Sequence, residues 1–221
     1  LAQREATTIM DGFPKVHRRV GGYNIDALAP SDGNMTHNMA QLLVGSEGTL
    51  ALSRRIQLQL HPIPAQRVLG VCHFSTFYAA MDATRHLVTL DPEAVELVDH
   101  TLMKLARDIP LFRNTLDTFV RGEPDALLLV EFTGDELDPL LTQLDRLNDM
   151  LGDLGFPDTL IKVTDPMQQR RVWEVRKAGL NIMMSMKGEG KPVSFIEDCA
   201  VPLEHLADYT DRLTEIFHRH G

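Results

Sequence analysis

The stretch Leu42-Leu43-Val44-Gly45-Ser46-Glu47-Gly48-Thr49-Leu50-Ala51 is the segment around which the rest of this chain is best interpreted. An apolar run leads into it, and two glycines bracket a Ser-Glu pair. A turn with glycine at both ends can adopt positive φ angles and bring its amide groups close to another backbone or to an anionic ligand. Taken alone, the pattern more often marks a tight turn that holds no cofactor, because glycine-rich turns are common.

The residues after this turn alternate between apolar and polar. Leucine or isoleucine at positions 52, 56, 58 and 60 alternates with arginine and glutamine, and this period of two predicts a β-strand over 50–60. His61-Pro62-Ile63-Pro64 follows, and proline cannot donate a hydrogen bond to a sheet. We therefore expect a domain boundary here, with one domain over 1–62 and a second over 65–221.

Composition narrows the class of protein. The chain has 221 residues, of which 43% are hydrophobic, so it can bury a sizeable core in one large or two small domains. Its net charge of -9 is spread along the sequence, which argues against a nucleic-acid surface. Cys72 and Cys199 lack a metal-like or redox spacing, and this favours buried thiols in a reducing cytoplasm. No apolar run is long enough to cross a bilayer, and no secretory signal opens the chain.

Beyond Pro64 the rhythm changes to alternating strands and helices. Apolar runs predict strands over 67–74, 94–99, 125–133, 159–163 and 193–200. Helical spacing predicts helices over 75–90, 101–107, 135–154 and 165–186, and a last helix that begins at Pro202 and ends near Phe217. This order predicts an α+β fold, an antiparallel sheet of ferredoxin-like character with helices on one face.

Three segments together resemble a known family. These are Gly-Tyr-Asn at 22–24 within Arg18–Leu28, the glycine turn at 42–51, and the strand that closes in His61-Pro62. Their order is similar to the end of the FAD-binding domain in FAD-linked oxidases of the vanillyl-alcohol-oxidase type, whose D-2-hydroxy-acid dehydrogenase branch includes D-lactate, glycolate and D-2-hydroxyglutarate enzymes. The resemblance implies that 1–62 is the C-terminal portion of that FAD-binding domain and that 65–221 is the substrate or cap domain, truncated at its C-terminus. It also implies these cofactor-binding residues: Gly22, Tyr23, Asn24, Gly45, Ser46, Glu47, Gly48 and Thr49.

A charged helix supplies the candidate substrate residue. Residues 170–180 place five charges around the only tryptophan, and the arginine of a Trp-x-x-Arg pattern in this family binds a substrate carboxylate; Arg176 matches it. A planar guanidinium can grip a carboxylate through two parallel hydrogen bonds. Without the resemblance, an arginine paired with Glu174 or another acid is the commoner interpretation. In members specific for D-2-hydroxyglutarate, a threonine and a lysine also contact the substrate. The nearest equivalents here are Leu180 and Ile196, which offer no hydrogen bond, so the particular substrate stays open.

The resemblance also implies what lies outside the sequence. The family's catalytic histidine and metal ligands would follow Gly221, and the main part of its FAD site would precede Leu1. His218 and His220 are too close on one helix to face a single ion, so no metal site is predicted. The length and sequence of the segments Arg19–Asn24 and Val193–Asp198 are most similar to those of bacterial members fused to an iron–sulfur domain. The acceptor of the electrons, a homo-oligomeric state and a peripheral position on the inner face of the membrane are left open.

The sequence thus predicts a fragment of an FAD-dependent oxidoreductase that oxidises a D-2-hydroxy acid to the 2-oxo acid by hydride transfer to flavin. The alternative is a non-catalytic α+β module that binds a small acid or serves in assembly. A reading frame that continues on both sides, into a flavin pyrophosphate loop and a histidine-rich strand, would distinguish the two.

Overall fold

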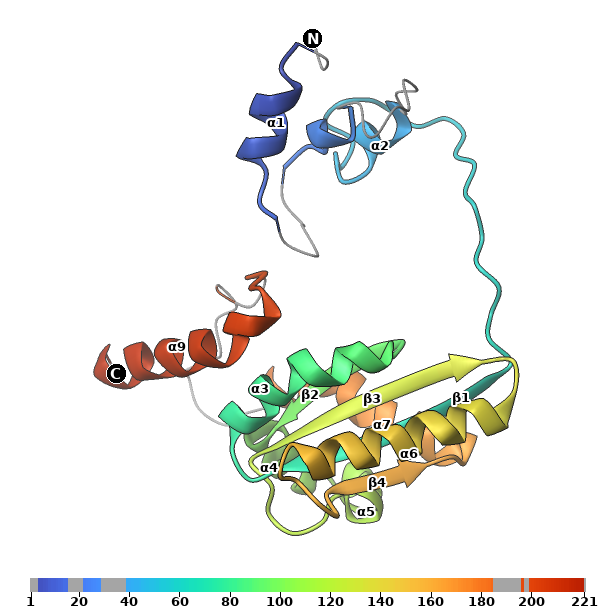
Figure 1. The fold of residues 1–221 in the computed structure, drawn as a ribbon, viewed down its shortest axis with the longest axis vertical. Coiled ribbons are helices and arrows are strands. Elements are labelled where there is room, and N and C mark those ends of the chain that lie inside the picture. The colour runs from blue at the N-terminus through green and yellow to red at the C-terminus, as the bar shows by residue number, and fades with distance from the viewer. Residues whose placement is uncertain (1–3, 16–21, 29–38, 185–195, 197–198, 221) are drawn as a thin grey trace. The chain divides into compact units, whose positions relative to one another are not determined.

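A computed structural model describes residues 4–15, 22–28, 39–184, 196 and 199–220. The chain divides into two units, residues 1–61 with 195–202, and residues 62–194 with 203–221. The second unit is built on four strands and most of the helices (Figure 1). None of the helices in these described ranges is long and apolar enough to cross a membrane.

The second unit is organised by one antiparallel sheet in the order β2-β3-β1-β4. Its two central strands pair along their whole length, from Gln66 opposite Gly134 to Phe74 opposite Ala126. One helix connects β1 to β2 and another connects β3 to β4, which is the ferredoxin-like arrangement. The strands are β1 (Gln66–Phe74), β2 (Ala94–Asp99), β3 (Ala126–Gly134) and β4 (Leu160–Val163).

One face of the sheet packs against α3 (Phe77–Leu87) and α6 (Leu137–Asp153). Alternate residues of a strand point to opposite faces, so β1 presents Val68, Gly70 and Cys72 to this side. A side chain at Gly70 would place its Cβ 2.6 Å from Leu147 Cδ2. The glycine therefore lets α6 lie close against the centre of the sheet.

The opposite face packs against a second set of helices. Leu69 and Val71 of β1 belong to a separate apolar cluster, together with buried side chains from four helices. In the view of Figure 1, α6 lies in front of the sheet and α7 behind it. The α+β class and the antiparallel sheet are therefore confirmed, but the expectation of helices on one face is wrong. The helices of this second face are α4 (His100–Arg107), α5 (Pro110–Phe119), α7 (Pro166–Lys177) and α8 (Gly179–Met184).

Side-chain caps account for the starts of three helices, α3, α4 and α7. The Asp99 and Asp165 side chains accept hydrogen bonds from the first turns of α4 and α7, as N-cap residues do. Thr76, rather than Ser75, caps α3. The expected single helix over 165–186 is two helices, because the chain turns at Ala178 and Gly179 then packs closely against Leu102. The helix α5 was not predicted from the sequence.

The last helix of the second unit is α9 (Leu206–His220), which follows the short helix η3 (Leu203–His205). It packs against α3, and the Tyr78 hydroxyl of α3 donates a hydrogen bond of 2.9 Å to Asp208 Oδ1. The hydrogen bond to Asp208 and the negative charge of that residue raise the pKa of the exposed Tyr78. The C-terminal helix predicted from the sequence is thus confirmed.

A further short helix, η2 (Val88–Leu90), follows α3.

The first unit holds only short helices: α1 (Ala6–Gly12), η1 (Ile25–Leu28) and α2 (Met39–Leu43). Residues 50–60, expected as a strand, run without sheet partners, and Leu52 is 95% exposed. A strand requires a neighbouring strand for its backbone groups, and the described residues supply none here. In the range 193–200, also expected as a strand, the described residues 196, 199 and 200 are not in one.

Cys72 is buried as expected, but Cys199 is exposed, and both are free thiols.

Candidate functional site

The glycine turn has the backbone geometry that its sequence predicts. Gly45 and Gly48 both have a φ angle of 77°, in the left-handed region, and a Cβ added at either would meet no atom within 4 Å. Between them, the Ser46 hydroxyl donates a hydrogen bond of 2.8 Å to the Leu43 carbonyl, and the side chain is buried. The serine therefore stabilises the turn from within and leaves the space beside the two glycines open.

Tyr23 and Asn24 lie against this same turn. The Thr49 hydroxyl donates to the Ser46 carbonyl, so the Tyr23 hydroxyl donates to Thr49 Oγ1, at 2.8 Å. The Asn24 amide donates to the Val44 carbonyl at 3.1 Å. Two segments that are about twenty residues apart in the sequence are thereby joined into one small cluster within the first unit.

The backbone of this cluster is open to close contact with a ligand. Glycines at a positive φ, with open space where a side chain would stand, allow peptide N–H groups to approach a ligand closely. Gly22, at a φ of 80°, has the same open space. The cluster also includes Glu47, which has a φ of 51°. Whether these residues bind FAD stays a prediction.

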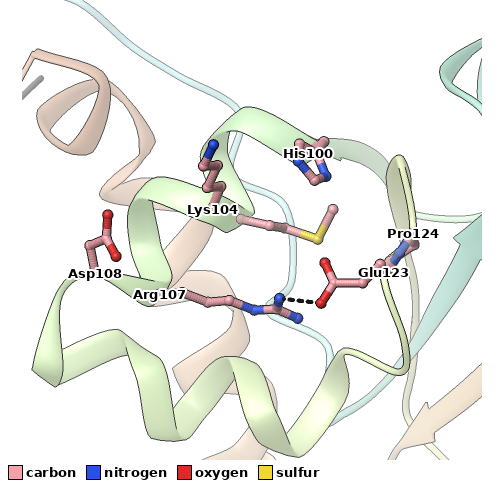
Figure 2. A pocket seen from close by; sticks show the side chains of 7 residues that line it. His100, Lys104, Arg107, Asp108, Glu123 and Pro124 are labelled. Atoms are coloured by element: carbon pink, nitrogen blue, oxygen red, sulfur yellow. Dashed lines mark hydrogen bonds and ion pairs between the residues drawn. The ribbon is translucent and has the colours of Figure 1, made fainter.

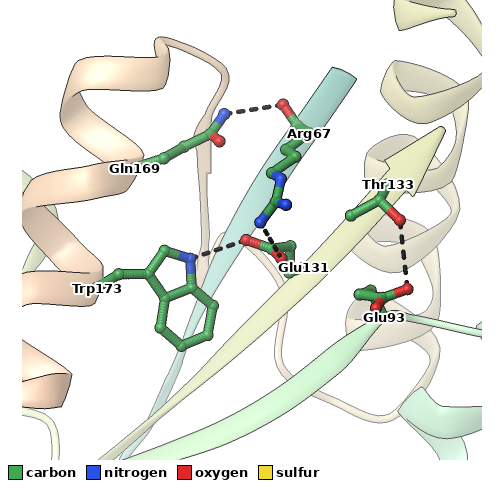
Figure 3. Close-up of polar contacts among 6 residues, drawn as sticks. All are labelled: Arg67, Glu93, Glu131, Thr133, Gln169 and Trp173. Carbon is green, nitrogen blue, oxygen red and sulfur yellow. Dashed lines mark hydrogen bonds and ion pairs between the residues drawn. The ribbon is translucent and has the colours of Figure 1, made fainter. Parts of the chain in front are cut away.

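The second candidate region is the face of α7 that crosses the sheet. Three polar side chains of α7, one from each successive turn, reach three different strands: Gln169 contacts β1, Trp173 contacts β3 and Arg176 contacts β2. The spacing of four and then three residues places them on a single helix face. Figure 3 shows the first two of these contacts.

Two of the three contacts are largely buried. The Gln169 side-chain amide donates to the Arg67 carbonyl at 2.9 Å and also to the carbonyls of Val163, the last residue of β4, and of Thr164. The Trp173 indole donates to Glu131 Oε2 at 2.8 Å, and Glu131 is 6% exposed. Arg67 Nη1 lies 3.6 Å from the other oxygen of this carboxylate, so a buried negative charge on the central strand has both a donor and a cation beside it.

Arg176 has a different environment. Its Nη2 donates to Glu96 Oε2 at 2.8 Å, and the two side chains are 39% and 41% exposed. Its Nε atom is buried and has no hydrogen-bond partner among the described residues. The structure therefore places the predicted substrate-binding arginine in a half-exposed ion pair, with Glu96 rather than Glu174 as the partner.

A groove of about 740 Å³ lies beside these contacts, between α7 and the sheet. Glu96 lines it, although Arg176 does not. Cations and carboxylates both face it, so its walls can bind an acid and orient it by charge. The other lining residues are Arg67, Ala94, Glu131, Gln169, Arg170, Trp173, Glu174 and Lys177.

A second cavity, of about 300 Å³, lies beside α4 (Figure 2). His100, Lys104 and Arg107 of α4 line it, and Arg107 is paired with Glu123 at 2.9 Å across it. The pair offsets the charges of these two side chains, but the buried Arg107 Nε has no hydrogen-bond partner among the described residues. Neither candidate group, the glycine turn or the face of α7, contributes to this cavity.

Sequence reasoning missed several residues of the α7 face. Glu131 gave a usable signal, because it is the only charged residue in the run Ala-Leu-Leu-Leu-Val-Glu-Phe, and such an acid needs a partner when it is buried. Glu96, in the middle of an apolar strand, gave the same signal. Gln169 gave none. Leu180 is exposed and Ile196 is half-buried, and no group of three metal-binding side chains occurs among the described residues.

The sheet, its two helical layers and the charged groove define an α+β domain of ferredoxin-like topology that can accommodate a small acid. Residues 63–221 match the family model described as FAD linked oxidases, C-terminal domain. The chain belongs to this family. The predicted family is therefore confirmed.

Three relatives illustrate the similarity. The chain is 31% identical to the D-2-hydroxyglutarate dehydrogenase of Pantoea ananatis (strain AJ13355) over 226 residues, which cover 96% of this chain and 22% of that protein. It is 28% identical to the enzyme of the same name from Escherichia coli (strain K12), over 99% of this chain and 22% of that protein. It is 25% identical to the mitochondrial D-lactate dehydrogenase [cytochrome] of Arabidopsis thaliana, over 80% and 29%. The chain thus spans about a fifth of the first two relatives.

Proposed function

We propose that this chain is part of an FAD-dependent dehydrogenase that oxidises a D-2-hydroxy acid to the corresponding 2-oxo acid. The observation that carries the proposal is the family match over 63–221, together with relatives whose names specify D-2-hydroxyglutarate and D-lactate. Bound FAD would supply the hydride acceptor for the hydrogen on C2 of the hydroxy acid. The chain's own contribution is to hold the substrate and to support the cofactor.

The two regions have separate roles in this proposal. The cluster of Tyr23, Asn24 and the turn 45–49 supports the cofactor through exposed peptide groups. Arg176 binds the substrate carboxylate, since a guanidinium with one nitrogen on Glu96 keeps other donors for a ligand. A small acid is thereby oriented before it loses its hydroxyl proton and the hydride on C2.

Anaerobic reduction of the full-length flavoprotein tests the proposal. The purified protein is mixed with D-lactate, glycolate or D-2-hydroxyglutarate, and the flavin absorbance is followed. We expect at least one of these acids to bleach the flavin, while L-lactate and L-2-hydroxyglutarate do so far more slowly. Failure of all three to bleach it would exclude the proposed function.

A pair of conservative variants tests the role of Arg176. Arg176→Lys keeps the positive charge but loses the planar guanidinium with its two parallel N–H donors. KM for the 2-hydroxy acid that reduces the flavin should therefore rise by about tenfold or more. Arg171 contacts the Met167 sulfur on the same helix, so Arg171→Lys makes the same change elsewhere on α7 and should leave KM unchanged. An equal effect of both variants would remove Arg176 from the substrate site.

A further inference from the structure

We propose that Glu96 positions Arg176 so that its guanidinium is oriented for the substrate carboxylate before the substrate binds. The proposal rests on the proposed function above, and it concerns a residue on β2 that sequence reasoning did not select. Glu96 acts through Arg176, so it is a positioning residue.

The place of Glu96 in the sheet supports this role. It lies opposite Leu129 on the edge strand β2 and points to the same face as Ala94 and Val98. That face is packed against the helices around α7. An acidic side chain at this position interrupts an apolar strand, and the described residue it contacts is Arg176.

The geometry of the contact leaves Arg176 able to bind a ligand. Only Nη2 of Arg176 is hydrogen-bonded to Glu96, through a single carboxylate oxygen. Because a guanidinium is rigid and planar, one short charged hydrogen bond restricts the orientation of the whole group. The two terminal nitrogens carry four N–H groups and Glu96 takes one of them, so donors remain for a ligand, whereas the buried Nε is out of its reach. An arginine held in this way loses less rotational freedom when a carboxylate binds.

The neighbouring contacts show that Glu96 is not needed to hold α7 in place. Gln169 and Trp173 fix the helix to β1 and β3 through partners that are mostly buried. A half-exposed ion pair such as Glu96–Arg176 contributes little to stability, because water screens it. Loss of Glu96 should therefore disturb the arginine and not the fold.

The experiment compares Glu96→Gln with Glu174→Gln in the full-length flavoprotein. Glu174 lines the same groove from α7, so both variants remove one negative charge from its walls. The substrate is whichever of D-lactate, glycolate and D-2-hydroxyglutarate bleaches the flavin. The measurements are KM and kcat, the Kd of the corresponding 2-oxo acid by calorimetry, and the thermal midpoint.

We expect Glu96→Gln to raise both KM and the Kd of the 2-oxo acid by about tenfold, which corresponds to the loss of one charge-assisted hydrogen bond. The thermal midpoint should not change. Glu174→Gln removes a negative charge from a groove that would hold an anion and has no contact with Arg176, so it should lower KM and Kd slightly and not raise them. In an Arg176→Lys background, Glu96→Gln should have no further effect, because the group it positions is gone.

Three results would overturn the inference. The first is an effect of Glu96→Gln equal to that of Glu174→Gln. The second is an effect that adds fully to that of Arg176→Lys. The third is a fall in KM, which would make Glu96 a competitor of the substrate. In each case the natural protein still reduces its flavin and the proposed function stands. If no acid bleaches the flavin of the natural protein, the proposed function and this inference fail together.

Discussion

The two units of this chain differ in what stabilises them. The sheet unit buries two apolar clusters, one on each face of the sheet. In the described part of the first unit, Ser46 is the only buried side chain, and the unit's apolar residues over 52–60 are exposed. The first unit is held by local turns and a few hydrogen bonds, such as those of Tyr23 and Asn24. Most of the folding free energy therefore comes from the sheet unit.

The comparison also separates two ways of building a site. In the first unit, open space beside two glycines is the essential feature, and the Ser46 hydroxyl forms a hydrogen bond within the turn itself. In the sheet unit, a well-packed core holds α7, and charged groups project from it into a groove. A rigid scaffold is suited to orienting a small acid, whereas a glycine turn is suited to close contact with a larger group.

Hydrogen exchange should show the largest contrast. Amides of β1 and β3 pair within the centre of the sheet, while residues 51–63 have no sheet partners in the described structure. We expect the central strands to exchange at least about a thousandfold more slowly than 51–63, because their exchange requires extensive unfolding. Mass spectrometry of peptic fragments would measure this. Similar rates in both regions would show that the first unit has a core of its own.

Two glycine-to-alanine substitutions test the packing of the sheet unit. Gly70→Ala would place a Cβ 2.6 Å from Leu147 Cδ2 and should lower the free energy of unfolding by about 1–3 kcal/mol. Gly152→Ala, near the end of α6, meets no atom within 4 Å and should raise it by about 0.5–1 kcal/mol. Urea unfolding measures both. If Gly70→Ala is neutral, α6 does not lie as close to the sheet as described.

The largely buried hydrogen bond from Trp173 to Glu131 should contribute more to stability than the half-exposed ion pair of Arg176 and Glu96. Trp173→Phe removes the donor to Glu131 and leaves a buried carboxylate with Arg67 at 3.6 Å, so we expect a loss of about 2 kcal/mol in unfolding free energy. In a Glu131→Gln background the same substitution should cost less, because a neutral amide is easier to leave without a donor. Equal losses in both backgrounds would mean that the indole contributes only by packing.

A smaller, pH-dependent effect is expected at His73. Arg121 N donates to its Nε2, so its Nδ1 donates to the Thr159 carbonyl, and the ring is held in the neutral form. Burial lowers the pKa of His73 below the ordinary value of 6.5, by more than the backbone contacts raise it. Below about pH 6.5 His73 is protonated in the unfolded chain but stays neutral in the folded one. The free energy of unfolding therefore decreases as the pH is lowered from about 6.5 to the folded-state pKa.

His73→Asn should remove this pH dependence in part. Thermal unfolding at pH 7.5 and pH 5.5 would show a smaller acid-induced drop in the variant than in the natural protein. An identical drop in both would assign the effect to other groups. The exposed His61 of the first unit, replaced by Asn, serves as a control that should leave the drop unchanged.

Much of the sheet unit was predictable from local pattern. The runs at 66–74 and 126–134 are apolar on both sides, so they indicate strands buried between two layers, and both are central strands in the structure. That same signal could have predicted helices on both faces. The strand expected over 50–60 was wrong, because alternation favours a half-buried strand only when a partner strand is present.

The sequence alone determined the family, the α+β class, the positions of most strands and helices, and the turn at Gly45–Gly48, because periodicity, capping residues and glycine act within a few residues of one another. Only the tertiary structure decided that Tyr23 joins that turn, that helices cover both faces, and that Arg176 is held by Glu96. Those contacts join residues far apart in the chain, and which of them meet depends on how the strands pair and how α7 crosses them.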